Sequence, residues 1–465
     1  MEGKKKRIEQ VFIHAMANNG FSVGRTKEGM VVFVERGIPG EEVMVELFSK
    51  KKGSWYGKIV DRIISSPHHV APYCSHFGAC GGCSWQNISY NEQVNQKEIW
   101  VRDAIHRIAK IQNVPFEPIL AAVDTKYYRN KLEFSFSTHR WWTDEQERDK
   151  SHSSALGFHR PGHFSKVVNI DHCFHQPGIS NELRNFIRNF AMDRGWEFYD
   201  IKEHKGYLRN LTIRNNLAGE FMLIVAVAYR SDDRMSLLVQ ELVKRFPEIK
   251  SLYSVVNPKL NDSIYDLELT LEHGEYCLTE HLDHAKFIIG PKSFFQTNPK
   301  QACKLFHTVE EYCSLSGEET VLDLYCGVGS IAIYLARHAA QVWGVETIPA
   351  AVEDAQKNAN ANQLTNCKFY VAEAENLPLA QWLKDKGTPD IVVVDPPRMG
   401  LHEKVCMELL QLRCPKIIYV SCNPSTQARD LERLSSAYDL TKIRPVDMFP
   451  QTNHVECVAL LSLRP

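Results

Sequence analysis

The chain has 465 residues, more than one hydrophobic core ordinarily serves, so we expect two to four domains. Its 44% hydrophobic and 24% charged residues exclude a disordered or fibrous protein. The net charge of -1 does not itself indicate a polyanionic partner, although residues 1–62 carry 12 Lys or Arg against 8 Asp or Glu. This local excess would suit contact with nucleic acid, and a solvated surface would give the same count.

The first ten residues are charged and lack the apolar stretch of a signal peptide. The longest apolar runs, at residues 221–229 and 391–394, are too short to cross a bilayer. We therefore expect a cytoplasmic protein without membrane contact. In that setting 13 cysteines predict reduced thiols rather than a disulfide framework.

Residues 1–63 are predicted to form a small β-barrel. Short β-rich runs (GFSVGR, MVVFVE, EEVMVELFS and WYGKIVDRII) alternate there with Gly, Pro and Lys-rich turns. Small barrels of this kind often bind oligonucleotides, but a fold alone does not fix a function. A cysteine-rich loop at 64–90 and an amphipathic helix at 91–110 follow. Residues 126–290 are mostly strand-like and antiparallel in character, which predicts an α+β middle domain.

After about residue 300, strands and helices alternate strictly. Buried strands are predicted at VLDLY, QVWGVE, CKFYVAE, DIVVVDPP and KIIYVSC, and amphipathic helices lie between several of them. Continuous Val and Ile runs separated by helices are typical of a parallel, doubly wound α/β sheet of the Rossmann-like kind.

A glycine-containing turn, Asp323-Leu-Tyr-Cys-Gly-Val-Gly-Ser330, joins the first of these strands to its helix. Gly327 and Gly329 let the backbone pass close to a ligand. Glu346 ends the next strand, where an acidic residue can bind ribose hydroxyls. A nicotinamide-binding fold would look much the same, but a third glycine is missing, and this favours S-adenosylmethionine.

The segment Asp395-Pro-Pro-Arg-Met-Gly400 ends the fourth parallel strand, at the edge where such sheets bind ligands. A rigid exit turn would explain the two prolines equally well. Similar Asp-Pro-Pro segments occur in amino-group methyltransferases, usually followed by an aromatic residue. Arg398 stands in that place here, which disfavours methylation of adenine N6.

Cys422, in Ser-Cys-Asn-Pro, ends the fifth strand at the same edge of the sheet. C5 of uracil is not nucleophilic at rest, but addition of a thiolate at C6 makes an enolate whose C5 can attack a methyl sulfonium. Such a division of one hard step into two is covalent catalysis. The thiol of cysteine has a pKa near about 8.5, so the site must lower it or remove the proton on binding.

The C-terminal segment Asp447-Met-Phe-Pro-Gln-Thr-Asn-His-Val-Glu456 offers a general base. After methyl transfer C5 still carries a hydrogen, which a nearby carboxylate can remove before the cysteine is eliminated. Glu456 is the candidate, and His454 is the less favoured alternative. Each residue considered singly would more often be structural, so the argument depends on their combination with the cofactor site.

These motifs together (FFQTN, DLYCGVG, DPPRMG, SCNP and FPQTNHVE) resemble the RNA 5-methyluridine methyltransferase family of the RumA/TrmA type over nearly the whole chain. The resemblance implies that Cys422 is the nucleophile and Glu456 the base. It also implies a set of contacts to S-adenosylmethionine by Gln296, Tyr325, Ser330, Glu346, Glu373 and Asp395. One departure puts the Glu373 contact in doubt, because Ala-Glu-Ala-Glu stands at 372–375 where the family has Gly-Asp-Ala-Glu.

Cys74, Cys80 and Cys83 are spaced C-x5-C-x2-C, and Cys173 is the candidate for a fourth ligand. Four thiolates hold either zinc or an iron–sulfur cluster. The spacing is a poor match to a zinc ribbon, and the family resemblance implies a [4Fe-4S] cluster. Zinc with His76 or His172 as a ligand is the alternative. A structural or RNA-positioning role is expected, since methyl transfer moves no net electrons.

The N-terminal barrel resembles a TRAM domain, a module associated with RNA binding. Downstream of it, His69 stands where the family commonly has Arg. Tyr128-Arg-Asn-Lys131 and Leu208-Arg-Asn210 are candidate RNA contacts. A stacked base cannot be attacked at C6, so the enzyme should take an unstacked uridine or flip one out. Aromatic residues that could stack on it are Phe294, Phe295 and Phe449.

We predict three parts: a TRAM-like barrel at 1–63, a cluster-bearing central domain at 64–93 and 126–290, and a methyltransferase domain at 94–125 and 291–465. The barrel and the cluster favour 23S rRNA over tRNA as substrate, because the tRNA-modifying relatives resemble only the catalytic part. A monomer without an obligatory protein partner is expected. Two other classes stay open, a non-catalytic RNA-binding factor and a redox enzyme that uses the cluster with a nicotinamide.

Overall fold

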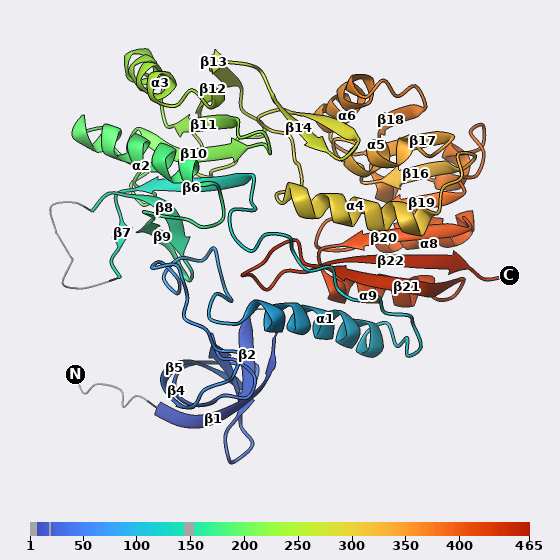
Figure 1. Cartoon of the computed structure of the whole chain (residues 1–465), viewed down its shortest axis with the longest axis horizontal. Helices are drawn as coiled ribbons and strands as arrows, with labels where there is room; N and C mark the ends of the chain where they lie inside the picture. The colour runs from blue at the N-terminus through green and yellow to red at the C-terminus, as the bar shows by residue number, and fades with distance from the viewer. Residues whose placement is uncertain (1–6, 18–19, 144–152) are drawn as a thin grey trace.

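In the computed structural model, which describes residues 7–17, 20–143 and 153–465, the strands form a closed barrel and three open sheets (Figure 1). The barrel consists of β1 (Arg7–Met16), β2 (Phe21–Arg25), β3 (Val31–Glu35), β4 (Glu42–Lys51) and β5 (Ser54–Ile64), in the order β1-β2-β3-β5-β4. Alternating valines and isoleucines fill its interior, as the period of two along a strand requires. Gly57 permits closure, since a Cβ there would lie 2.3 Å from a methyl group of Val45.

The central region is built on an eight-stranded sheet with the order β13-β12-β11-β10-β6-β8-β9-β7. Its elements are β6 (Lys131–Ser137), β7 (Arg140–Trp141), β8 (Ala155–Arg160), β9 (His163–Asn169), α2 (Gly178–Asp193), β10 (Leu208–Asn215), β11 (Phe221–Val227), α3 (Asp232–Arg245), β12 (Ile249–Val256) and β13 (Leu269–Gly274). Most pairs are antiparallel, as expected, but β11–β12 and β7–β9 are parallel. The crossover helix α3 explains the first of these pairs, because a parallel pair cannot be joined by a tight turn.

Only one face of this sheet is covered by helices. Leu211 and Ile213 of β10 point to the side where α2 and α3 pack, in one continuous apolar core. Asn210 and Thr212 alternate with them and therefore point to the other side.

The C-terminal region is a seven-stranded sheet with the order β18-β17-β16-β19-β20-β22-β21, preceded by the hairpin β14 (Leu278–Leu282) and β15 (Ala285–Ile289). In chain order it comprises α4 (Pro299–Cys313), β16 (Thr320–Leu324), α5 (Ser330–Ala336), β17 (Gln341–Glu346), α6 (Pro349–Ala361), β18 (Cys367–Val371), the 3-10 helix η1 (Ala374–Asn376), α7 (Leu379–Trp382), β19 (Ile391–Val394), α8 (Glu403–Leu412), β20 (Lys416–Ser421), α9 (Pro424–Leu434), β21 (Tyr438–Val446) and β22 (Glu456–Leu463). The five predicted strands are parallel neighbours, so the predicted α/β sheet is confirmed. The two last strands are antiparallel, and the sequence analysis did not predict them.

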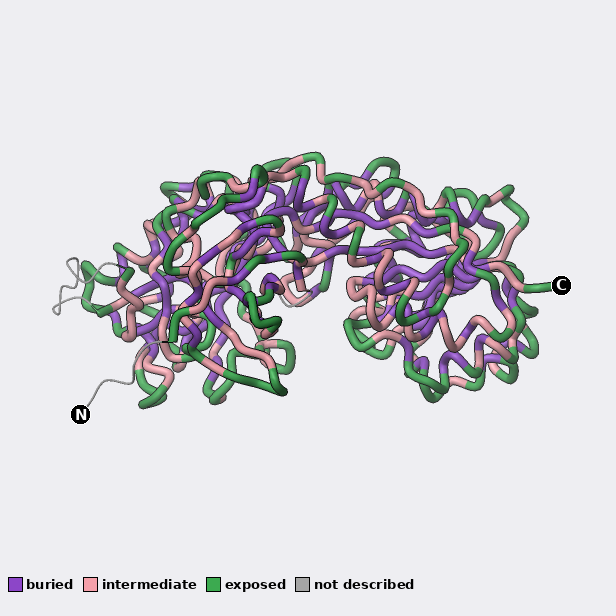
Figure 2. The backbone as a smooth tube through the Cα atoms, turned by 90° about the horizontal axis from the view of Figure 1, so that it is seen from below, coloured by how far each residue is buried: buried purple, intermediate pink, exposed green. Residues whose placement is uncertain are grey.

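Helix α1 (Tyr90–Arg107) joins the N-terminal part of the chain to the C-terminal sheet. Val101, Ala104 and Ile105 pack in the same core as strands β16, β19 and β20. Residues 116 and 120 add isolated bridges to β21. Figure 2 shows buried backbone running through the middle of both large sheets. We propose the three-part division given above on the basis of this packing.

Across the described ranges, none of the helices combines the length and the apolar character needed to span a membrane.

Candidate functional site

The strand register brings three predicted cofactor residues to one edge of the C-terminal sheet. Leu324 at the end of β16 is paired with Val345 of β17 and with Val394 of β19. The next residue of each strand is Tyr325, Glu346 or Asp395, so these three side chains follow one another along the carboxyl edge. This is the edge where open α/β sheets bind ligands.

The turn after β16 has the backbone that its glycines predict. Gly327 and Gly329 have φ angles of 55° and 79°, and a Cβ at Gly329 would lie 3.0–3.1 Å from three neighbouring side-chain atoms. A Cβ at Gly327 would meet no atom within 4 Å, so the chain passes open space there. Tyr325 also has a positive φ of 68°, which is strained for a bulky residue and is typical of functional turns.

Glu346 fixes this turn and keeps capacity for a ligand. Its carboxylate accepts the Gly327 N–H at 3.1 Å and the Ile348 N–H at 3.0 Å. A carboxylate has about four acceptor sites, so oxygens of Glu346 can still accept ribose hydroxyls. The geometry therefore fits the cofactor residue that the sequence predicted.

Asp323, at the start of the glycine turn, is a buried acid for which the sequence suggested no role. One carboxylate oxygen accepts the Ala332 N–H at 3.1 Å, and the other has no hydrogen-bond partner among the described residues. Burial, followed by the charges of Asp395 and Glu346, raises the pKa of Asp323 well above its usual range. Burial also raises the pKa of Asp395 to about 7.

The other predicted cofactor residues lie in less telling positions. The backbone carbonyl of Gln296 accepts a hydrogen bond from Asn130 at 3.0 Å. Ser330 is half-buried at the first position of α5, directly after the glycine turn. Glu373 is exposed, and its carboxylate accepts the side-chain amide of Asn376 at 2.5 Å. Contacts of these three residues to the cofactor stay predictions.

Cys422 and Glu456 are brought together by the antiparallel pair that the sequence analysis missed. Ser421 of β20 is paired with Cys457 of β22, so the next register position places Cys422 opposite Glu456. Side chains directly opposite in such a pair have Cβ atoms about 4.5–5.5 Å apart. Burial, and then the charge of Glu456, raises the pKa of Cys422 to about 11. Burial, and then the charge of Asp395, raises the pKa of Glu456 to about 8.

Arg398 is a positive charge close to both Cys422 and Glu456, and its place in the sequence had been interpreted only as evidence against adenine chemistry. Its guanidinium lowers the pKa of both Cys422 and Glu456, against the larger effect of burial. Its backbone carbonyl accepts the side-chain amide of Asn423 at 3.0 Å, which ties the segment after β19 to the segment after β20. The position of Arg398 in the Asp-Pro-Pro motif was the available signal.

A cavity of about 450 Å³ opens beside Cys422. Arg398 and His454 line it from the catalytic side, and Trp100 and Arg107 of α1 line the opposite wall. Burial lowers the pKa of His454 to about 4, so its imidazole is neutral near pH 7. The cavity therefore combines a thiol, a cation and a neutral hydrogen-bonding ring.

A buried ion pair anchors the segment that carries Glu456. Lys97 of α1 donates to Asp447 at 2.6 Å and to the carbonyl of Phe449 at 3.0 Å, and the side chains of Lys97 and Asp447 are both fully buried. Tyr90 donates to the other oxygen of Asp447 at 2.8 Å. Lys97 and Asp447 are 350 positions apart in the sequence, so no local pattern indicates that they form a pair.

Replacement of Lys97 by Met should destabilise the protein by about 3–5 kcal/mol, because it leaves the Asp447 carboxylate buried without a counter-charge. The matched double variant Lys97→Met, Asp447→Leu should recover much of that loss, since no buried charge is left. Urea denaturation of the three proteins measures both effects. Equal stability of the single variant and the original chain would contradict the role given to the pair.

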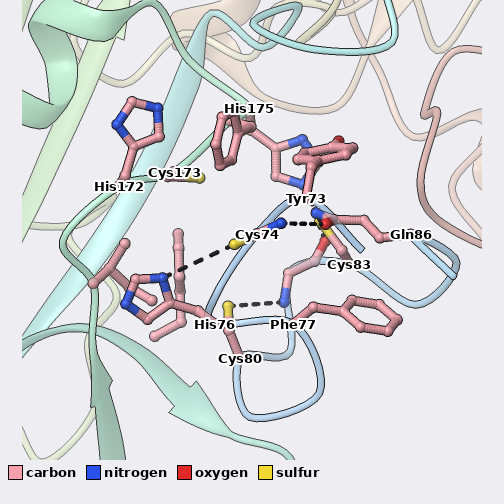
Figure 3. Close-up of a pocket in the computed structure, with 14 residues that line it drawn as sticks. Tyr73, Cys74, His76, Phe77, Cys80, Cys83, Gln86, His172, Cys173 and His175 are labelled. Atoms are coloured by element: carbon pink, nitrogen blue, oxygen red, sulfur yellow. Dashed lines mark hydrogen bonds between the residues drawn. The ribbon is translucent and has the colours of Figure 1, made fainter. Parts of the chain in front are cut away.

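The four predicted cysteine ligands surround one small cavity (Figure 3). Cys74, Cys80 and Cys83 come from the loop between β5 and α1, and Cys173 comes from the segment after β9. The Sγ of Cys80 accepts the Gly82 N–H at 3.3 Å, and the Sγ of Cys83 accepts the side-chain amide of Gln86 at 3.2 Å.

Burial raises the pKa of all four thiols, to about 12 for Cys80 and Cys83. Four buried thiolates without a cationic partner would be costly, so the chemistry of this donor set fits a cluster that would neutralise them. Within the ranges that the structure describes, no group of three or more His, Cys, Asp or Glu side chains is arranged to hold a single metal ion.

Two of the predicted RNA contacts, Arg209 and Phe295, are buried. Arg209 is 2% exposed and donates to the carbonyls of Asn257 and Asn261, with a further bond to Asp262 at 3.1 Å. Phe295 is 3% exposed and packs against a core phenylalanine, so it cannot stack on a base as it stands. By contrast, Phe294 is 69% exposed. The prediction for Phe295 was wrong because a sequence does not show which of two neighbouring side chains is buried in the core.

The sequence model of the family described as tRNA (Uracil-5-)-methyltransferase matches residues 284–464, and the TRAM domain model matches residues 4–60. A protein of Bacteroides thetaiotaomicron that is named an uncharacterized RNA methyltransferase is 41% identical, covering 97% of this chain and 100% of its own. A protein of the same name from Porphyromonas gingivalis is 42% identical, covering 93% and 96%.

Among solved structures, the tRNA (uracil-54, C5)-methyltransferase of Pyrococcus abyssi in complex with S-adenosyl-L-homocysteine is similar to the whole chain. The match has a TM-score of 0.77 at 29% identity and covers 97% of this chain and 99% of that one.

Proposed function

The chain belongs to the RNA methyltransferases that match the tRNA (Uracil-5-)-methyltransferase family, here with a TRAM domain, and we propose that it methylates C5 of a uridine in RNA through a covalent adduct with Cys422. The observation that carries this proposal is the register of β20 and β22, which places a thiol opposite a carboxylate beside the cofactor edge. A non-catalytic RNA-binding factor would need no such pair. A nicotinamide enzyme would need no thiol nucleophile.

The first step is addition of the Cys422 thiolate to C6 of the uracil ring. The resting thiol is protonated, because its pKa is raised to about 11, so the proton must leave when RNA binds. Arg398 favours the thiolate, because its charge lowers the pKa of Cys422. Addition breaks the C5–C6 double bond and leaves a negative charge delocalised over C5 and the C4 carbonyl.

Bound S-adenosylmethionine supplies an electrophilic methyl group, which C5 takes as S-adenosylhomocysteine is formed. Glu346, Tyr325 and Asp395 are proposed to hold the cofactor, with Gln296, Ser330 and Glu373 as further predicted contacts. Glu456 then removes the proton from C5, the C5–C6 double bond re-forms, and the sulfur of Cys422 leaves. Atoms and charge balance, and no oxidant or reductant is needed.

RNA that contains 5-fluorouridine tests this function. Fluorine at C5 cannot leave as a cation, so the methylated adduct should accumulate with one chain bound per modified site. The adduct should require S-adenosylmethionine and survive denaturing electrophoresis. A fluorinated RNA that is bound but never covalently attached would exclude the mechanism.

We propose 23S rRNA, the substrate that the sequence predicted, and tRNA as the two candidate substrates. The prediction relied on tRNA-modifying relatives resembling only the catalytic part, and the P. abyssi tRNA enzyme contradicts that premise, since it matches 97% of this chain. The extra domains therefore do not separate the two RNA classes. Transfer of labelled methyl groups to 23S rRNA and to bulk tRNA, both transcribed in vitro, decides between them.

We propose that Cys74, Cys80, Cys83 and Cys173 hold a [4Fe-4S] cluster, with zinc as the alternative. The support is the shared cavity and the N–H donors to two of the sulfurs, because hydrogen bonds to thiolate ligands tune such clusters. The cluster would cross-link the cysteine loop to the central sheet. Methyl transfer needs no electron from it.

Cys80→Ser should lower the iron content of anaerobically purified protein from about four atoms per chain to less than half of that. The matched variant Cys277→Ala changes a cysteine that directly precedes β14 and lies outside the cavity. It should keep the full iron content. Iron and zinc are measured by mass spectrometry, and the cluster by its visible absorbance. Stoichiometric zinc without iron would contradict the cluster.

We further propose that the enzyme works as a monomer in the cytoplasm without an obligatory protein partner. The support is the predicted RNA substrate and the presence of nucleophile, base and cofactor edge in one chain. Light scattering of the free enzyme measures the oligomeric state.

A further inference from the structure

The helix-free face of the eight-stranded sheet contains a cavity that the proposed reaction does not use. It has a volume of about 280 Å³, near the lower end of the roughly 300–1,000 Å³ of small-molecule sites. Its floor is formed by Lys131 and Glu133 of β6 with Asn210 and Thr212 of β10. The register pairs Thr212 with Glu133, so these side chains share one face.

A fixed loop forms one wall of this cavity. Residues 257–262 are held by buried Arg209, whose guanidinium donates to backbone carbonyls and to Asp262. The same loop carries Tyr265, which is 64% exposed and lines the cavity. A large aromatic side chain is thus presented to solvent by a loop whose position is determined by a buried cation.

The floor carries an acceptor without a partner. The side-chain oxygen of Asn210 is buried and has no hydrogen-bond partner among the described residues, although its amide nitrogen lies 3.4 Å from Ser135. A buried carbonyl left unsatisfied costs free energy, and rotation of this half-buried side chain toward the cavity that it lines would let a ligand N–H group remove that cost. Every nucleobase has such a donor on its Watson–Crick edge.

The charges of the cavity suit a neutral base with phosphate at the rim. Glu133 is paired with Lys131 at 2.7 Å, and Asp262 with Arg209 at 3.1 Å, so both carboxylates are balanced. Lys292 on the rim donates to the carbonyl of Leu267, and an ammonium has three donors, so it keeps capacity for a further acceptor.

The cavity is connected to the catalytic edge by short stretches of chain. Lys292 is followed by exposed Phe294 and then by the predicted cofactor contact Gln296. Lys131 is preceded by Asn130, which donates to the carbonyl of Gln296 at 3.0 Å. Two short stretches of chain therefore link this cavity to Gln296.

We propose that this cavity is a subsite for one unpaired nucleotide of the RNA substrate, away from the target uridine. The base stacks on Tyr265 and donates to the side-chain oxygen of Asn210, and Lys292 contacts an adjoining phosphate. The proposal rests on the proposed function only in taking RNA as the ligand. It extends that function by a second point of recognition on the central sheet.

The test measures RNA binding without catalysis, in Cys422→Ala protein, so that it stands apart from methyl transfer. The probes are fluorescein-labelled oligouridylates of 20 and 4 nucleotides, followed by anisotropy. Tyr265→Ala should weaken binding of the 20-mer roughly tenfold, since base–aromatic stacking contributes that order of affinity. The 4-mer offers fewer nucleotides to the subsite and can also bind at the cavity beside Cys422, so it should lose less affinity than the 20-mer.

Two further variants separate a ligand contact from a structural one. Asn210→Leu removes the orphan acceptor, so it should weaken binding of the 20-mer while the melting temperature stays equal or rises. Tyr276→Ala, at an exposed tyrosine (66%) outside the cavity, should leave binding of both probes unchanged.

A direct map completes the test. A 20-mer that contains 4-thiouridine should cross-link on irradiation to the peptide that carries Tyr265. Equal binding of the 20-mer by Tyr265→Ala protein, or cross-links confined to the walls around residue 422, would overturn the subsite and leave the proposed methylation untouched.

Discussion

Cys422→Ala should lower the rate of methyl transfer by roughly 10⁴-fold or more and abolish the adduct with 5-fluorouridine RNA, because no other group takes over a covalent step when the nucleophile is removed. Cofactor binding should persist, since Glu346 and the glycine turn are untouched. Single-turnover transfer of labelled methyl groups, with equilibrium binding of S-adenosylmethionine alongside, measures both quantities.

The matched control is Cys277→Ala, which removes a half-buried thiol elsewhere in the chain. It should methylate at the original rate. Full activity of Cys422→Ala protein would exclude the covalent mechanism, whereas joint loss of activity and cofactor binding would show a folding defect, which the melting temperature then checks.

Glu456→Gln should trap the reaction after methyl transfer. Without a base for the C5 proton the cysteine cannot be eliminated, so a methylated adduct should accumulate on ordinary RNA and turnover should fall by about 10²–10⁴-fold. Denaturing electrophoresis with labelled RNA detects the adduct. Normal turnover by this variant would move the role of base to another group, for which His454 is the alternative.

The same variant should be more stable than the original chain at neutral and alkaline pH. The pKa of Glu456 rises from 4.5 to about 8 on folding, so the folded chain holds this proton more tightly than the unfolded chain. The resulting contribution to the free energy of unfolding is complete below pH 4.5 and is lost as the pH rises through 8. A glutamine has no proton to lose. The difference should reach a few kcal/mol at pH 8, at about 1.4 kcal/mol for each pKa unit, and vanish near pH 4.5.

For the original chain, the step that needs the Glu456 carboxylate should accelerate as the pH rises toward 8. A buried, poorly ionised base is thus costly for stability and suited to its proposed task. Functional sites commonly keep such groups at the expense of stability.

Much of the fold could be predicted from the sequence because local patterns of residues determine its strands and turns. Runs such as IVVV at 391–394 identify buried parallel strands, and Gly327 with Gly329 marks the turn between β16 and α5. The side chains that follow those strands must meet at one edge, so the proximity of Tyr325, Glu346 and Asp395 followed from topology.

What could not be predicted depends on contacts distant in sequence. Strands β21 and β22 add antiparallel pairs to a sheet whose first five strands are parallel. The sequence pattern before Tyr438 does not indicate this change of direction. The buried pair of Lys97 with Asp447 needs a partner 350 positions away. Arg209 was predicted to contact RNA because the sequence shows its charge but does not show that it is buried.

The place of β22 between β20 and β21 has a consequence for biosynthesis. A nascent chain that ends before residue 456 already contains the glycine turn, the thiol and every parallel strand, but the gap beside β20 is still unfilled. The carboxylate comes with β22, when that strand inserts between its two neighbours. A chain cut before residue 456 would therefore keep the thiol but lose both the carboxylate and the strand that joins β20 to β21.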